Sequence, residues 1–480
     1  MKRYIFIILV MFSSFFLVAQ IKLHPENPHY FSYNGKPTIL IASTEHYGAV
    51  INSDFDYKKY LDKLSDAGLN LTRVFMGDYC EAPNDFCIVN NTLSPAKGKL
   101  ITPWARSSEK GYYNGGNKFD LSRWNPAYFK RLHDFMQYAS DKGIVVEAVL
   151  FFSGYTRASS PLHTPNNINS TSDVAANKYM TLDNGNLIAF QEAYCRKIVR
   201  ELNVYDNLIV NVANEPWFGN QQNKGFSSPP SDEVKVWIKT VSEWVTDEEH
   251  KLPKKHLVSV DYTNEGNIIT HEELKKYFSN IRVFNSHYDR NADFIKLNYN
   301  LNIPITFNET GLMPLTTPEY RIQGWKYIFS GGSMYNNLDF TFQVGHEDGL
   351  GNGKFSCEWY SGNSDPETKY QLAALLKFMN GVDFIKMKPD DSFIELRYGD
   401  YEVFAMANEN YEYIVYFIGR AKARIKLYIP PGDWEFTWIN PSDLSVLKKE
   451  LMTGSNTGTL NISGPDFRED IVLKVKRIKK

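Results

Sequence analysis

The stretch that decides the fold is Leu208–Phe218, with the sequence LIVNVANEPWF. Leu208–Ala213 is a short apolar run of the kind that forms a buried strand. Asn214-Glu215-Pro216 follows at once, and proline cannot continue a central strand. The sequence therefore predicts a strand that ends by placing the carboxylate of Glu215 at its C-terminal edge. The stretch ITFNETG, residues 305–311, has the same form and places Glu309 alike.

Working outward, apolar runs alternate with amphipathic segments along most of the chain. The predicted strands are Thr38–Ser43, Asn70–Met76, Ile144–Phe152, Leu208–Ala213, Leu257–Tyr262, Arg282–His287, Pro304–Asn308 and Gly332–Leu338. The predicted helices are Asp56–Ala67, Asn125–Lys142, Ile188–Leu202, Ser231–Glu248, Glu272–Phe278, Pro318–Phe329 and Pro366–Met379, with a weak segment at Asn291–Asn298.

Eight such units predict an α/β fold, a (β/α)8 TIM barrel with a parallel sheet covered by helices. The alternative is an open doubly wound sheet, but no G-x-G-x-x-G fingerprint follows the first strand. The long segments Tyr79–Trp124 and Ser153–Asn186 both follow strands. In a barrel they would lie on the C-terminal face, where substrates bind.

Beyond residue 387 the pattern changes to short alternating runs such as FIELRY (393–398) and YEVFAMAN (401–408). Regular short strands predict a small antiparallel β-sandwich. We therefore expect a catalytic domain over 20–387 and a β-sandwich domain over 388–480.

Residues 1–19 resemble a signal peptide, with Lys2 and Arg3 before an apolar run and Ala19 at its end. An uncleaved N-terminal anchor is the alternative. The first cysteine is Cys80, so no lipoprotein anchor is expected. We expect export to the periplasm or the medium, with no membrane span after cleavage.

The composition narrows the function classes. The 480 residues carry a net charge of −2, which gives no support to a nucleic-acid partner. Aromatic residues make up 15% of the chain and fit either a large core or platforms for sugar rings. Cys80 and Cys87 are close enough for a local disulfide, with unpaired thiols as the equal alternative. No spacing of cysteine and histidine indicates a metal site, so neither a metal nor a cofactor is expected.

Glu215 and Glu309 are the candidate catalytic residues. Cleavage of a glycosidic bond needs two carboxyl groups, one to protonate the leaving oxygen and one to attack or to activate water. The ends of the fourth and seventh strands face each other across the mouth of a closed barrel. The two glutamates can therefore meet there, although each motif alone fits a surface glutamate after a strand.

This pair resembles glycoside hydrolase clan A, the retaining barrels that include the family 5 cellulase-like enzymes. The resemblance implies that Glu215 is the acid/base and Glu309 the nucleophile, about 5–5.5 Å apart. It also implies that Asn214 holds a sugar 2-hydroxyl and that Arg73, in LTRVF, orients the nucleophile. His287 and Tyr288, in SHYDR, match positions that contact the nucleophile or the sugar.

A closer resemblance rests on FSYNGKPTILIAST (31–44), FDLSRWNPAYFKRL (119–132) and GGSMYNNLDFTFQVGHEDG (331–349). These stretches are similar to a group of secreted Bacteroidetes proteins in which such a barrel precedes a β-domain of a type labelled collagen-binding. One departure concerns the eighth strand, SMYNNLDF, which lacks the tryptophan that often forms the floor of the clan's sugar subsite.

Further residues are candidates for substrate binding. His46 and Tyr47 follow the first strand, Trp217 follows the acid/base motif, and Trp359 lies beyond the eighth strand. Glu347, in GHEDG, is expected to form a hydrogen bond with the substrate and not to coordinate a metal. For His46 the competing interpretation is a half-buried structural histidine, and for Trp217 it is core packing.

The sequence thus predicts a secreted retaining β-glycoside hydrolase, expected as a monomer, that acts on a neutral polysaccharide or oligosaccharide. β-Glucans, including β-1,3-linked ones, are preferred, while mannans and galactans stay open. The alternative is a catalytically inactive carbohydrate- or matrix-binding protein.

Overall fold

The computed structural model describes residues 20–153, 157–218, 228–312, 315–357, 365–454 and 458–478. The predicted signal peptide and Trp359 lie outside the described residues. In this part of the chain no helix combines the length and the apolar character needed to cross a bilayer.

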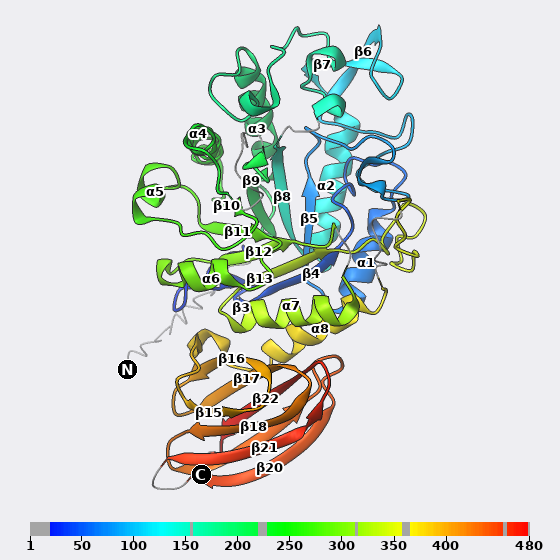
Figure 1. The fold of residues 1–480 in the computed structure, drawn as a ribbon. Coiled ribbons are helices and arrows are strands. Elements are labelled where there is room, and N and C mark those ends of the chain that lie inside the picture. The colour runs from blue at the N-terminus through cyan, green and yellow to red at the C-terminus, as the bar shows by residue number, and fades with distance from the viewer. Residues whose placement is uncertain are drawn as a thin grey trace, which may run out of the picture.

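The larger domain is a parallel barrel of eight strands (Figure 1). In chain order the strands are β4 (Leu40–Thr44), β5 (Leu71–Phe75), β8 (Val145–Phe152), β9 (Leu208–Asn214), β10 (Leu257–Thr263), β11 (Val283–His287), β12 (Ile305–Glu309) and β13 (Met334–Leu338). They pair in the order β4-β13-β12-β11-β10-β9-β8-β5. The predicted α/β barrel is confirmed, and each strand lies within two residues of its predicted bounds.

The strands β4 and β5 stand at the two ends of this order, and a side chain of Asn70 bridges them in place of a regular series of backbone hydrogen bonds. Asn70 donates to the carbonyl of Ile39 and accepts from the amide of Ile41, and the amide of Phe75 donates to Tyr47 at the far end. The sheet thus closes on itself, which brings the C-terminal ends of all its strands around one mouth.

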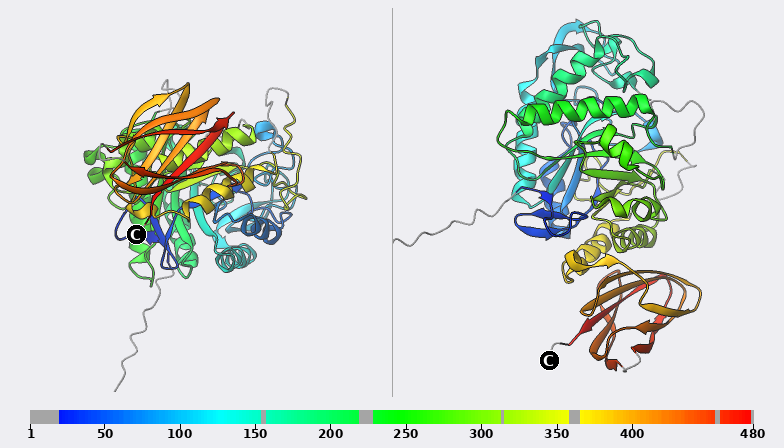
Figure 2. Two further views of the ribbon diagram at one scale, coloured as in Figure 1. Left: turned by 90° about the horizontal axis from the view of Figure 1, so that it is seen from below. Right: turned by 90° about the vertical axis from the view of Figure 1, so that its left-hand side faces the viewer.

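Eight helices cover the barrel in the described part of the chain. Figure 2 shows this outer layer from two further sides. The helices are α1 (Tyr57–Ala67), α2 (Pro126–Asp141), α3 (Leu187–Leu202), α4 (Asp232–Glu249), α5 (His271–Lys276), α6 (Asp293–Asn298), α7 (Thr317–Phe329) and α8 (Thr368–Met379). Short 3-10 turns lie at Asp85–Cys87, Arg157–Ser159, Thr164–Asn166, Ala176–Lys178, Tyr299–Leu301 and Phe384–Lys386.

A small sheet of β1 (Lys22–Leu23), β2 (Phe31–Tyr33) and β3 (Lys36–Thr38) seals the N-terminal end of the barrel. Its buried side chains pack against the first residues of the barrel strands, among them Leu71 and Val145. In the described part of the chain this end of the barrel is covered, so the candidate site is sought at the C-terminal face.

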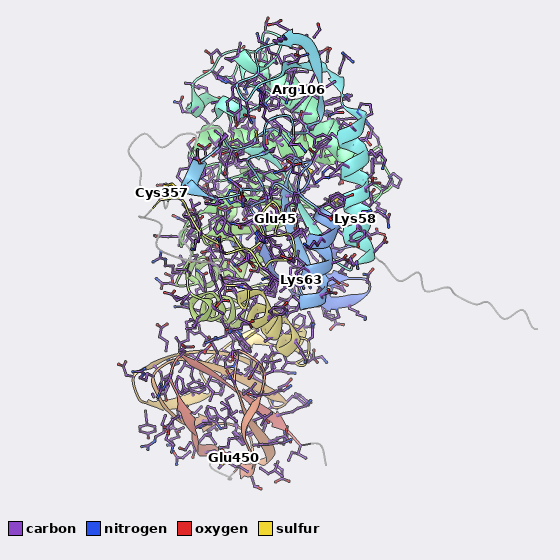
Figure 3. All side chains as sticks on the ribbon, turned by 90° about the vertical axis from the view of Figure 1, so that its right-hand side faces the viewer. Glu45, Lys58, Lys63, Arg106, Cys357 and Glu450 are labelled. Atoms are coloured by element: carbon purple, nitrogen blue, oxygen red, sulfur yellow. A yellow bond between two sulfur atoms is a disulfide. The ribbon has the colours of Figure 1, made fainter. Side chains whose placement is uncertain are left out.

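The insertion after β5 carries the hairpin of β6 (Trp104–Lys110) and β7 (Asn117–Trp124). It is joined to the segment after β13 by a disulfide between Cys87 and Cys357. The expected local bridge from Cys80 to Cys87, and its alternative of free thiols at both, are wrong, because barrel closure brings together two segments 270 residues apart. Figure 3 labels Cys357 at the edge of the barrel domain.

The C-terminal strands form the predicted antiparallel sandwich. They are β14 (Lys388–Pro389), β15 (Ile394–Tyr398), β16 (Tyr401–Asn408), β17 (Glu412–Gly419), β18 (Ala421–Tyr428), β19 (Gly432–Ile439), β20 (Val446–Gly454), β21 (Thr459–Phe467) and β22 (Asp470–Arg477). One sheet runs β14-β16-β17-β22-β19-β20 and the other β15-β18-β21. Trp434 and Trp438 are fully buried in the core between them.

The sandwich is docked on α7. Arg321 on α7 is buried and holds both carboxylate oxygens of Asp470 at 2.9 and 2.7 Å, and it also contacts Glu469 at 2.7 Å. Trp325, one turn further along the helix, stacks on Tyr416 with ring centroids 5.5 Å apart. The hydrophobic core of the barrel domain therefore continues into the sandwich.

Candidate active site

The interior of the barrel holds a polar belt, meaning Arg73, Glu147, Asn211, Asp261, Asn285 and Asn308, one from each of six strands. All six are fully buried. One oxygen of Asp261 accepts from the amides of Asn211, Asn285 and Asn308 at 2.8, 2.8 and 3.0 Å, and Glu147 accepts from the same three amides. Buried charges persist only when they are paired and hydrogen-bonded, and this belt satisfies both conditions.

Arg73 is the cation of the belt. Its guanidinium contacts Asp261 at 2.8 Å, Glu147 at 3.3 Å and Glu309 at 3.0 Å, and it donates to Asn214 at 2.8 Å. The ring of Tyr47 lies over it, 4.7 Å from the centroid. Although burial works in the opposite direction, these carboxylates raise the pKa of Arg73. One side chain thus ties the interior of the barrel to the two residues at its mouth.

Glu309, the last residue of β12, is held from both sides. Arg73 donates to one carboxylate oxygen at 3.0 Å and the hydroxyl of Tyr288 donates to the other at 3.2 Å. Its side chain is almost fully buried yet lines the cavity at the mouth. The carboxylate is therefore fixed in orientation while its charge is compensated.

Glu215 directly follows β9, and its carboxylate oxygen lies within 4.8 Å of one of Glu309. Burial raises the pKa of Glu215 to about 7, the hydrogen bond from His287 works against that rise, and the charge of Glu309 adds to it. The two neighbouring carboxyl groups thus differ in environment, since Arg73 pairs with Glu309 and not with Glu215.

His287, at the end of β11, lies beneath both glutamates. Its Nδ1 is 3.1 Å from Glu215 and 3.5 Å from Glu309, and its Nε2 is 3.0 Å from Asp261. Burial alone would lower the pKa of His287, but the charges of Glu309 and Asp261 raise it to about 10. The surrounding carboxylates therefore favour the protonated ring, whose Nδ1 forms a hydrogen bond with Glu215.

The backbone is strained at three residues of the mouth. Tyr47, Glu215 and Tyr288 have φ of 59°, 47° and 52°. Side chains other than glycine avoid this left-handed region, and such residues cost about 1–3 kcal/mol unless their surroundings hold them there. Strain of this kind clusters at functional sites, which supports a functional role for this mouth.

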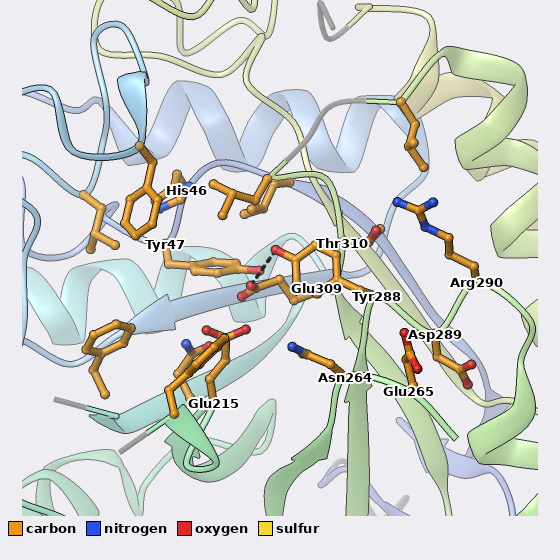
Figure 4. Close-up of a pocket in the computed structure, with 18 of the residues that line it drawn as sticks. His46, Tyr47, Glu215, Asn264, Glu265, Tyr288, Asp289, Arg290, Glu309 and Thr310 are labelled. Atoms are coloured by element: carbon orange, nitrogen blue, oxygen red, sulfur yellow. Dashed lines mark hydrogen bonds between the residues drawn. The ribbon is translucent and has the colours of Figure 1, made fainter. Parts of the chain in front are cut away.

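The mouth opens into a cavity of about 870 Å³ (Figure 4). Among the predicted site residues, Glu215, Glu309, Asn214, Tyr288, His46 and Tyr47 line it. Arg73 and His287 lie one layer below and contact the glutamates. Sequence reasoning missed other lining residues, notably Glu81, Phe86, Asn264, Glu265, Asp289 and Arg290.

Two predicted residues lie elsewhere. Trp217 is buried, and its ring lies edge-on to that of His287 with 5.2 Å between the ring centroids. This position fits the core-packing interpretation of Trp217 and not that of a sugar platform in the cavity. The carboxylate of Glu347 accepts from the amide of Gly345 at 2.9 Å within its own loop, and it does not line the cavity. Its substrate-binding role is therefore not supported.

Glu215, His287 and Glu309 together offer three donor atoms that could surround a cation. A ligand histidine must be neutral, however, because a protonated nitrogen has no lone pair to give. His287 has carboxylates at both nitrogens, which favours its protonated form. The donor set therefore suits proton chemistry better than metal binding.

Comparisons with known proteins agree with this architecture. A domain of unknown function, DUF6298, matches residues 100–294. No curated protein matches the chain. A protein from Bacteroides vulgatus ATCC 8482 assigned as a glycoside hydrolase superimposes with a TM-score of 0.68 at 13% identity, over 96% of this chain and 83% of that one. A glycoside hydrolase family 5 protein from the same organism superimposes with a TM-score of 0.60 at 14% identity, over 95% of this chain and 94% of that one. The chain therefore shares its whole fold, the barrel and the appended sandwich, with solved glycoside hydrolases.

Proposed function

We propose that the protein is a retaining β-glycoside hydrolase with Glu309 as nucleophile and Glu215 as acid/base. The observation that carries the proposal is the pair itself, two carboxylates within 4.8 Å at one cavity. Retaining glycosidases hold their carboxyl groups about 5–5.5 Å apart, whereas inverting ones need about 6.5–9.5 Å to admit a water molecule. The β configuration of the substrate is what the resemblance to clan A implies.

The geometry supports a double displacement. In the first step a Glu309 oxygen bonds to the anomeric carbon, the bond to the leaving oxygen breaks, and Glu215 gives that oxygen its proton. In the second step Glu215 takes a proton from water, the resulting hydroxide bonds to the anomeric carbon, and the Glu309 carboxylate is released. Arg73 and Tyr288 hold Glu309 in place throughout.

The charges around the cavity favour a neutral glycan. Apart from the catalytic pair, the described lining carries four further carboxylates, those of Glu81, Glu265, Asp289 and Asp293, and one guanidinium, that of Arg290. Such a lining repels polyuronates and attracts no anion. We propose β-glucans, including β-1,3-linked ones, as first candidates, with mannans and galactans next.

A substrate panel tests the function. We expect the wild-type protein to release reducing ends from one of laminarin, barley β-glucan, galactomannan or galactan, and Glu309→Gln to release none. Proton NMR of the first product should show the β anomer. Binding of a polysaccharide by the wild type without hydrolysis of any would contradict the proposal and favour the inactive carbohydrate-binding alternative.

The pH dependence follows from Glu215, which must carry its proton in the free enzyme. The pKa of Glu215 is raised to about 7. We therefore expect kcat/KM to stay constant below pH 7 and to decrease above it, reaching about a tenth of the plateau value at pH 8. The measurement is a pH profile with an aryl glycoside of activated leaving group. In Glu215→Gln the decrease of kcat/KM at alkaline pH should disappear. An unchanged decrease in that variant would show that another group titrates there.

A further inference from the structure

The two ends of the cavity differ in burial. On the side of β4, β5 and β8, the lining residues His46, Tyr47, Glu81, Leu93 and Phe152 are all at most 8% exposed, and Phe86 beside them is half-buried. On the side of β10 and β11, Glu265, Arg290 and Asn291 are exposed. Figure 4 shows His46 and Tyr47 on one side of Glu309, and Asp289 and Arg290 on the other. Among the described residues, the cavity is therefore more deeply enclosed at the first end, called the blind end below, and more exposed at the second, called the open end.

The blind end is built by the insertion after β5, which supplies Glu81, Phe86 and Leu93 to the lining. Its two arms are joined by the bond from the amide of Glu81 to the carbonyl of Leu93 at 2.9 Å. The disulfide from Cys87 to Cys357 anchors it to the segment after β13. The wall is thus fastened at several points and is part of the fold.

The proposed double displacement decides which half of a substrate enters this end. After the first step the glycone is bonded to Glu309, and the leaving sugar must depart before water can attack. A leaving sugar in the blind end would be trapped behind the covalently held glycone. The glycone must therefore occupy the blind end, and the leaving chain must extend through the open one.

We propose that the protein is exo-acting and takes the non-reducing terminal sugars of a glycan into this blind end. The inference rests on the proposed function and goes beyond it by assigning the mode of attack. An internal segment of a chain would need room to continue past His46 and Glu81, which are both buried side chains of the described wall.

A buried polar pair at the blind end fits recognition of that sugar. Nε2 of His46 lies 2.9 Å from one carboxylate oxygen of Glu81, and the amide of Asn91 donates to the other. A carboxylate oxygen accepts more than one hydrogen bond, so Glu81 keeps acceptor capacity for hydroxyl groups. We assign Glu81 as the residue that binds hydroxyls of the non-reducing terminal sugar.

End-blocked substrates test the mode of attack. With 2-chloro-4-nitrophenyl β-glycosides of di- and trisaccharides, we expect a 4,6-O-benzylidene group on the non-reducing sugar to lower kcat/KM at least 100-fold. Equal cleavage of blocked and free forms would overturn exo action and leave the glycosidase function standing. Failure to cleave any glycoside or polysaccharide would instead count against the proposed function.

Binding gives a readout that needs no turnover. In saturation-transfer NMR of Glu309→Gln with laminaritetraose and cellotetraose, the strongest contacts should be at the non-reducing sugars. Strong contacts at internal sugars with a mobile non-reducing end would overturn the proposal.

Glu81→Gln tests the assigned residue. A lost hydrogen bond to a charged group costs roughly 10- to 100-fold in kcat/KM. The wild type should cleave glycosides that lack the 4- or 6-hydroxyl with the same roughly 10- to 100-fold lower kcat/KM. For these deoxygenated glycosides, Glu81→Gln should lower kcat/KM no further. A merely structural role of Glu81 would not produce this dependence on the substrate hydroxyl. Glu109→Gln, exposed on β6 of the same insertion, is the matched control. Equal losses for full and deoxygenated glycosides in Glu81→Gln would contradict the assignment.

Discussion

Replacing Glu309 with alanine is expected to lower kcat by about 10⁴-fold or more, because the covalent step loses its nucleophile. The variant leaves a space at the position that Arg73 and Tyr288 now hold. Azide can occupy such a space and attack the anomeric carbon from the same side. With an activated aryl glycoside, sodium azide should therefore restore turnover and yield the α-glycosyl azide, which NMR identifies.

The complementary variant is Glu215→Ala. There the nucleophile is intact, so azide should attack the covalent intermediate and yield the β-glycosyl azide. The two products of opposite configuration separate the two roles. Wild-type turnover in Glu309→Ala, or the same anomer from both variants, would refute the assignment.

The second large effect concerns stability. Arg73→Met should lower the free energy of unfolding by about 3–5 kcal/mol, since it leaves Asp261 and Glu147 buried without their cation. Arg73 holds the pKa of Asp261 below its usual range together with His287, in spite of burial. The loss should therefore be largest at neutral pH, where that carboxyl is ionised, and shrink as acid protonates it. Urea unfolding followed by fluorescence at two pH values measures it.

Two further variants sharpen the test. Arg73→Lys keeps the charge but lacks the planar fork that reaches several partners, so an intermediate loss is expected. Arg282→Met, at an exposed position just before β11, should stay within about 0.5 kcal/mol of the wild type. A stability of Arg73→Met equal to that of Arg282→Met would show that the belt does not depend on its cation.

The barrel could be predicted because each strand is a separate local signal. The approach of Glu215 to Glu309 at one mouth could also be predicted, since Asn214-Glu215-Pro216 and Asn308-Glu309-Thr310 each end a strand, and strand ends converge in a barrel. The belt could not be predicted, because Glu147 and Asp261 lie inside apolar runs, and a single polar residue in such a run is compatible with a buried strand. Polar residues recurring inside several such runs, as in VVEAVLFF and LVSVDYT, were the available signal.

The remaining misses have a common physical cause. The partner of Cys87 could not be predicted, since Cys357 approaches it only after the barrel has closed. Likewise the sequence of the insertion after β5 does not tell which of its aromatic residues face a ligand, and Trp104 and Tyr112 prove to be buried outside the cavity. Long-range packing decides these outcomes, and no local pattern encodes it.

The docking of the sandwich on α7 has a consequence for the orientation of the two domains. Arg321 is hydrogen-bonded to Asp470, and one hydrophobic core includes residues of both domains. The sandwich is therefore packed against the barrel and not joined to it by a flexible linker alone. A partner bound to the sandwich would therefore stand at one fixed angle to the barrel. Binding at the sandwich would then set the direction in which the cavity faces that partner.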